Sequence, residues 1–179
     1  MKKIFLLSLA CVATIVSFAQ VRKNVFLEVM GNAPHASINY DARFLPDRND
    51  GFGFRAGVST SVSWYNVKAL TLGVPVGVNY LLGKQHALEV GLVAVPEFTV
   101  KQPESEQFTT DPSIAKTLFH GNLNIGYRYQ PLKERGVMIN ALWTPTIISS
   151  KGYKDLKSRP LAMFGIGIGY SFKYFHDLR

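Results

Sequence analysis

Six charged residues fall on the polar side of stretches in which apolar and polar residues alternate. They are three acids and three arginines: Glu28, Asp41, Arg43, Arg55, Glu89 and Arg128. Carboxylates and guanidinium groups that face one another could act as an acid and a base, or form a path for protons or ions. The equal numbers of the two signs favour a network of ion pairs that satisfies buried charges.

Nucleophilic catalysis would need a serine and a histidine that the fold brings together. The candidates are His35, His86, His120, His176, Ser37, Ser61 and Ser149. No spacing among them singles out a catalytic triad, and the chain has no His-x-x-x-His pair or acidic loop signature of a metal site. We therefore expect no catalysis, no metal and no cofactor.

The elements that carry these residues are strands, because the dominant period along the chain is two. Eight alternating stretches are recognisable: 25–30, 37–44, 52–59, 70–82, 88–92, 122–129, 137–144 and 164–172. Pro75 lies inside the fourth stretch and removes one backbone donor, so we expect a bulge or a local opening of the ladder there.

The connections alternate between short and long. Segments 46–51, 83–86 and 131–136 are rich in turn-forming residues, whereas we expect loops over 31–36, 64–69, 96–116 and 146–160. Asp111-Pro112 could begin a short helix within the third loop. Short turns on one side and longer loops on the other predict an all-β fold, an eight-stranded antiparallel up-and-down barrel with both termini on the short-turn side.

Length and composition agree with one exported domain. The chain has 179 residues, of which 47% are hydrophobic and 18% charged. Lys2 and Lys3 precede an apolar stretch, and Ser17-Phe18-Ala19 is a small-x-small cleavage signal, so we predict a signal peptide over 1–19 and a barrel domain over 20–179. Lipidation of Cys11 is an alternative, although Ser8 stands where a lipoprotein signal favours leucine.

Alternation alone does not tell which face of the barrel is inside. A soluble carrier of the lipocalin type would bury the apolar face, and a membrane barrel would bury the polar one. Nine of the 15 glycines lie on the polar face, the apolar face carries no charge in any of the eight stretches, and aromatic residues gather near the strand ends. These features predict a transmembrane barrel in which the six charged residues form a lumenal ion-pair network.

Four runs carry a resemblance to a known family: INYDARF (38–44), PVGVNYLLGKQHALEVGL (75–92), GYRYQPLKERGVMINALWTP (126–145) and GIGIGYSF (165–172). They resemble small bacterial outer-membrane β-barrel proteins, the OmpA/OmpX-like eight-stranded barrels, over nearly all of the mature chain. The resemblance implies the outer membrane of a Gram-negative cell envelope. It also implies insertion by the barrel-assembly machinery, with Phe172 or Phe175 as the C-terminal aromatic that the machinery reads, and it brings no catalytic residues.

The last loop of the expected barrel is basic. Its cations are Lys151, Lys154, Lys157 and Arg159, offset by Asp155. They could contact the phosphates of lipopolysaccharide or an anionic partner, or they could be a solvated loop tip. A nucleic-acid partner is disfavoured, because the loop would face outside the cell and no stacking motif accompanies it.

Three functions are compatible with such a barrel. The first is a structural or partner-binding role through the extracellular loops, as a single protein or as a subunit of a larger outer-membrane complex. The second is modification of lipid or lipopolysaccharide by an outer-membrane enzyme. The third is a narrow channel, although a lumen filled by side chains would conduct poorly.

Overall fold

The computed structural model describes residues 21–33, 35–46, 48–63, 69–101, 114–151 and 162–173. Within these ranges the chain forms nine strands and no α-helix long and apolar enough to cross a membrane. The strands are β1 (Arg22–Met30), β2 (Ala36–Arg43), β3 (Gly51–Ser63), β4 (Ala69–Gly73), β5 (Val76–Leu82), β6 (His86–Lys101), β7 (Ile114–Tyr129), β8 (Arg135–Ser149) and β9 (Ala162–Lys173).

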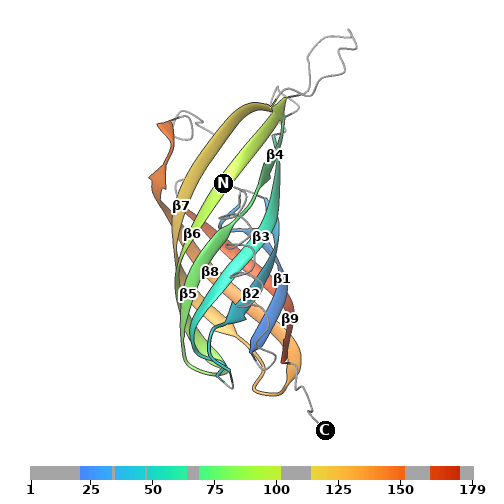
Figure 1. Ribbon diagram of the computed structural model, residues 1–179, viewed down its shortest axis with the longest axis vertical. Coiled ribbons are helices and arrows are strands. Elements are labelled where there is room, and N and C mark those ends of the chain that lie inside the picture. Colours follow the sequence, from blue (N-terminus) through green and yellow to red (C-terminus); the bar gives the residue numbers. More distant parts are fainter. Residues whose placement is uncertain are drawn as a thin grey trace, which may run out of the picture.

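The strands make one antiparallel sheet that closes on itself (Figure 1). Apart from β4 and β5, strands that follow each other in the chain pair, and β1 pairs with β9 to close the ring. β4 and β5 share one position in the sheet, because both pair with β3 on one side and with β6 on the other. The molecule is therefore a closed eight-stranded up-and-down barrel, which confirms the predicted fold class.

The division between β4 and β5 falls at Pro75, as the missing backbone donor led us to expect. Pairing resumes in the same register on both sides, with Gly73 opposite Ser59 and Val76 opposite Ala56, so the ladder opens locally without a register shift. The carbonyl of Pro75 accepts a hydrogen bond from the Gly57 N–H (2.8 Å), which satisfies one of the polar groups at the opening.

Apolar side chains cover the outside of the barrel and polar ones fill its centre. Val76 and Ile168 are 48% and 58% exposed, whereas Asn124 is 1% exposed and Gly167 is buried. This orientation excludes the soluble-carrier alternative, because a soluble barrel would bury its apolar face and expose its polar one.

Glycine is required where neighbouring strands approach closely inside the barrel. A Cβ atom added to Gly126 would lie 2.8 Å from the Cα atom of Leu142 on β8. At Gly121, on the same strand, the nearest atom would be the Cβ of Ile148 at an ordinary 3.7 Å. Gly126 therefore allows β7 and β8 to pair at a distance that a side chain would prevent.

Aromatic rings on the outer surface gather near the short turns. Phe52 and Tyr80 meet edge to face with centroids 4.7 Å apart, and Phe44 stacks on Phe54 at 6.2 Å. Toward the loops, Phe98, Trp143 and Phe164 are exposed. The two groups form the pair of interfacial belts typical of membrane barrels, so far as the described residues extend.

The strands on the loop side are longer than the sequence predicted. The expected loop 96–116 is partly strand, since β6 continues to Lys101 and β7 begins at Ile114, and the first four residues of the expected loop 146–160 belong to β8. Ala36 and Ala69 are also strand residues. Pro96 does not begin a loop as predicted: it pairs with Phe119, and its carbonyl accepts a hydrogen bond from the Val74 N–H (3.0 Å). The helix expected at Asp111-Pro112 lies outside the described residues.

Candidate functional site in the barrel lumen

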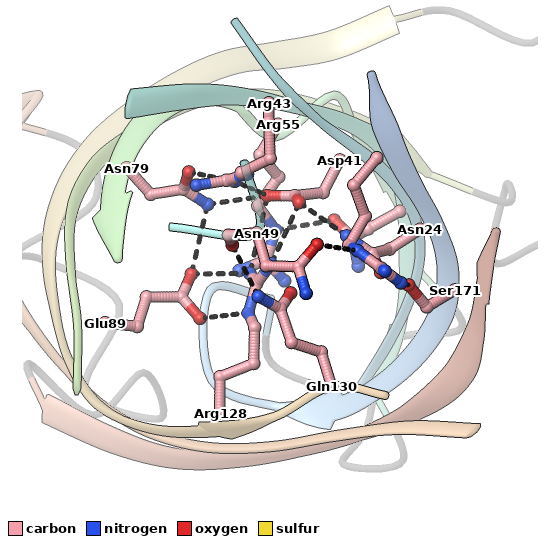
Figure 2. A network of polar contacts seen from close by, with 12 residues as sticks. Asn24, Asp41, Arg43, Asn49, Arg55, Asn79, Glu89, Arg128, Gln130 and Ser171 are labelled. Carbon is pink, nitrogen blue, oxygen red and sulfur yellow. Dashed lines mark hydrogen bonds and ion pairs between the residues drawn. The ribbon is translucent and has the colours of Figure 1, made fainter. Parts of the chain in front are cut away.

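Arg128 on β7 lies at the centre of the lumenal network. Its Nη1 donates to Asp41 Oδ1 and its Nε to Glu89 Oε2, both at 2.8 Å (Figure 2). All three side chains are fully buried. One guanidinium therefore joins carboxylates from β2 and β6 across the lumen, and each charge has an opposite charge in contact.

Arg43 and Asn79 extend this cluster. The Nη2 atom of Arg43 donates to Asp41 Oδ2 at 2.7 Å and to Asn79 Oδ1 at 2.5 Å. The amide nitrogen of Asn79 donates to Asp41 and to Glu89. Asn79 thus satisfies both acids with its donor and an arginine with its acceptor, which removes much of the cost of burying these groups.

A second group of lumenal residues lies toward the loops. Arg55 forms a buried ion pair with Glu28 and donates from Nε to Asn39 Oδ1 at 3.1 Å. The Arg55 guanidinium also lies 4.7 Å from the centroid of the Phe26 ring, and that of Arg128 lies 6.0 Å from the same ring. Phe26 therefore fills the space between the two charged groups and interacts with both cations.

The structure places all six predicted network residues in the lumen, as two groups. Asp41, Arg43, Glu89 and Arg128 form one connected cluster, and Glu28 with Arg55 forms the other.

Sequence reasoning missed Arg22, which closes the short-turn end of the lumen. Its Nε donates to Asn49 Oδ1 (2.6 Å), its Nη1 to Ser171 Oγ (2.8 Å) and its Nη2 to the Lys133 carbonyl (2.9 Å). Gln130 donates to the Asn49 carbonyl from the other side (Figure 2). These hydrogen bonds hold the turn between β2 and β3 across the short-turn end of the lumen. Arg22 is an even number of residues before Glu28 and therefore points to the same face of the strand. If the first predicted strand had begun three residues earlier, it would have placed Arg22 in the lumen.

Glu97 and His120 were also missed as lumenal residues, and they lie at the loop end. His120 Nδ1 is 3.9 Å from Glu97 Oε1, and His120 Nε2 is 3.2 Å from the Asn32 carbonyl. Asn32 belongs to the β1–β2 connection, and its backbone N–H donates to Glu28 at 3.2 Å. This connection therefore turns into the mouth of the barrel. Glu97 is an even number of residues after Glu89, and His120 is an even number of residues before Arg128. The period of two therefore places both missed residues on the lumenal face.

Apart from Ser37, the remaining sequence candidates lie away from the lumenal network or outside the described residues. His35 is exposed at the loop end, and His86 lies on the outer surface with its Nδ1 atom 2.6 Å from the Tyr127 hydroxyl. Ser37 accepts a hydrogen bond from Asn39 inside the barrel, and Ser149 is half-buried at the end of β8. Of the basic loop residues, Lys151 is exposed. The side chain of Ser61 and the residues His176, Lys154, Lys157 and Arg159 are outside the described part.

Among the described residues, no group of three or more His, Cys, Asp or Glu side chains could hold a metal ion. Glu97 and His120 together supply only two ligands at the loop end. The described lumen therefore offers ion pairs and hydrogen bonds rather than a metal centre.

One exposed ion pair lies in the turn between β2 and β3. Arg48 donates two hydrogen bonds to the Asp50 carboxylate, at 3.1 and 2.9 Å. These bonds lower the pKa of the Asp50 carboxyl below its ordinary value and raise that of the Arg48 guanidinium. Because the pair is solvent-exposed, it shapes the turn more than it stabilises the barrel.

Comparison with known proteins finds similarity of structure only. No family model and no curated protein matches the sequence. A major outer membrane protein from Thermus thermophilus superposes with a TM-score of 0.58 and 12% identity, over 86% of this chain and 99% of that chain. Neisserial surface protein A (NspA) gives 0.50 and 9%, over 86% of this chain and 96% of its own. The closed sheet, the apolar exterior and these two similarities show that the chain has the fold of the small outer-membrane β-barrel proteins.

Proposed function

We propose that this protein resides in the outer membrane as a closed barrel with a structural or partner-binding role, and not as a channel. In this proposal residues 1–19 are a cleaved signal peptide, and the barrel-assembly machinery inserts residues 20–179. The apolar exterior and the two aromatic belts support membrane insertion, because they match the chemistry of a bilayer and its two interfaces.

The filled lumen is the observation that carries the proposal. In the described part of the chain, four buried arginines (Arg22, Arg43, Arg55 and Arg128) balance four buried acids (Glu28, Asp41, Glu89 and Glu97). The turn that carries Asn49 and the connection that carries Asn32 turn inward at the two ends. An eight-stranded barrel has room for its side chains and little else, so we expect the described side chains to leave no continuous path for ions.

Planar bilayer recording tests whether the barrel is closed. The wild type should give no steady single-channel current, because its lumenal charges are paired and immobile. The double variant E89A/R128A removes an ion pair without changing the net charge, and it should leak small ions more than the wild type does. Large, steady currents from the wild type would overturn the closed-barrel proposal.

An apolar patch beyond Trp143, on the loop side of the barrel, supports a protein partner. Ile147 and Ile148 at the end of β8 are 54% and 62% exposed, and Phe119 on β7 is 40% exposed. The Ser150 N–H donates to the Phe119 carbonyl (2.8 Å), which holds the two strands together here. Ile147 is four residues beyond Trp143, and hence about 10 Å further from the membrane centre in a strand tilted by roughly 40°.

The unequal extension of the strands on the loop side explains why this patch is accessible. Among the described residues, β6 and β7 pair with each other as far as Val100 and Ile114, and β8 and β9 pair as far as Pro145 and Ala162 (Figure 1). One side of the barrel therefore rises above the other. Burial against a protein partner would stabilise isoleucines that are exposed about 10 Å beyond Trp143.

Photo-crosslinking in cells tests the partner-binding role. A photoreactive residue at position 148 should give a discrete protein adduct that the substitution Ile147→Ser weakens. The same residue at position 168, in the middle of the lipid-facing surface, serves as the control and should give lipid adducts only. The absence of a protein adduct at position 148 would contradict a partner at this patch.

The enzyme alternative is disfavoured by the position of its best base. His120 is 1% exposed and lies inside the lumen beside Glu97 and Asn32, where a lipid in the surrounding bilayer does not reach. We therefore propose a non-enzymatic role, for which deletion of the protein should leave the lipid A profile unchanged. We also propose that Lys151 and the neighbouring loop cations contact lipopolysaccharide phosphates.

A further inference from the structure

Two cations flank an aromatic ring on the outer surface near the short turns. Register places Phe172 on β9 directly opposite Lys23 on β1 and Arg135 on β8. The three residues belong to the outward-facing series of their strands; Arg135 is exposed, and Lys23 and Phe172 are half-buried. Neighbouring Cα atoms in such pairs are about 5 Å apart, so the two cationic residues begin about 10 Å apart on either side of the ring.

The neighbouring rows fix the depth of this site. The next outward row toward the membrane centre consists of Val137, Tyr170 and Val25, all of them exposed, and the row after it is aliphatic. Phe164, in the loop-side belt, is eight residues from Phe172 along β9, which corresponds to about 20 Å along the membrane normal in a tilted strand. The two cations therefore lie at the level of the lipid headgroups on the short-turn side.

Positive charge dominates this sector of the rim. Besides the buried Arg22, its described charged residues are four cations and one acid: Lys23, Lys133, Arg135, Lys173 and Glu134. The turn that carries three of them is fixed in place, because the Lys173 N–H donates to the Glu134 carbonyl (2.7 Å) and Arg22 donates to the Lys133 carbonyl. The backbone of this turn is thus held in a defined position at the short-turn end of the barrel.

We propose that Lys23, Phe172 and Arg135 form a binding site for the phosphate headgroup of an anionic phospholipid in the leaflet on the short-turn side. The two cations bind the phosphate from both sides, and the acyl chains lie along Val25, Tyr170 and Val137. A phospholipid fits better than a free phosphate ion, because the cations stand directly above an apolar and aromatic surface. The site rests on the membrane insertion that the proposed function assumes, and it does not depend on whether the lumen conducts.

Native mass spectrometry of the folded barrel, released from detergent with added lipid, tests this site. The wild type should retain phosphatidylglycerol in preference to phosphatidylcholine. The double variant K23Q/R135Q should lose about fivefold in affinity for each cation, on the order of 25-fold in all. The variant R48Q/K84Q loses the same charge from other turns and should retain the wild-type preference. Gel mobility with and without boiling checks that each variant is folded.

Three results would overturn the proposal. They are an absence of lipid preference in the wild type, an equal loss in K23Q/R135Q and R48Q/K84Q, and displacement of the lipid by millimolar inorganic phosphate. The second result would indicate a general effect of charge, and the third a site for free phosphate. None of these results changes the conductance expected of the wild type, so failure of the lipid site is distinguishable from failure of the proposed function.

Discussion

Replacement of Arg128 by methionine should destabilise the barrel more than replacement of any exposed cation. Arg128 is the partner of both Asp41 and Glu89. After its removal Asp41 still contacts Arg43 (2.7 Å), but Glu89 retains the weaker hydrogen bond from Asn79 (3.2 Å). Loss of one partner of a buried ion pair costs about 3–5 kcal/mol, and we expect about 4 kcal/mol here. Because the folding free energy of a typical domain is only about 5–15 kcal/mol, this loss is large.

Urea unfolding of the barrel in lipid vesicles, followed by gel mobility without boiling, measures this effect. Lys84→Met is the matched control, because Lys84 is an exposed cation in the turn between β5 and β6, and it should change the unfolding free energy by less than about 0.5 kcal/mol. The double variant R128M/E89Q should recover part of the loss, since it also removes the unpaired carboxylate. An R128M protein as stable as the wild type, or an equal loss in K84M, would refute the structural importance of the network.

Three further outcomes follow from the fold. Gly126→Ala should reduce the yield of folded barrel, as judged by gel mobility, whereas Gly121→Ala on the same strand should fold normally, because only the first introduces a Cβ within 2.8 Å of a neighbouring backbone atom. The Asp50 carboxyl should titrate below the ordinary aspartate range in a carbon-13 NMR experiment and return toward it in R48Q. Since the folded-state pKa is lowered, any stability that Asp50 contributes is present above the ordinary pKa and disappears as the pH falls through the lowered one. Ile168→Arg should lower the unfolding free energy by about 2–4 kcal/mol in vesicles, and Ile168→Ala should lower it less; equal losses would argue against a position in the hydrocarbon.

Most of what the sequence could predict came from the alternation of residues between the two faces of each strand. A period of two assigns Glu28 and Asp41 to the same face as the glycines, and this was sufficient to predict a polar lumen and an apolar exterior. Pro75 predicted the local opening of the ladder, because a missing donor has a local consequence. The composition of short segments was thus sufficient to predict the closed barrel and the face of each strand that points into the lumen.

The partners across the lumen could not be obtained in this way. Asp41 contacts Arg128, which is 87 positions later in the chain. The two residues lie at the same height in the lumen because of the tilt and stagger of the strands, and no local sequence pattern encodes that stagger. Glu97 and His120 were missed for a different reason. Pro96 was interpreted as the start of a loop, although a proline can remain in a strand where its missing donor is not needed.

Spin labels placed one at a time along β8, from Val137 to Trp143, test the orientation of the barrel most directly. Accessibility to oxygen, which concentrates in hydrocarbon, should alternate in vesicles: high at Val137, Ile139, Ala141 and Trp143, and low at Met138, Asn140 and Leu142. The opposite phase, with the label at position 140 in lipid and the label at position 139 shielded, would contradict the assignment of the apolar surface to the bilayer and of the ion-pair network to the lumen.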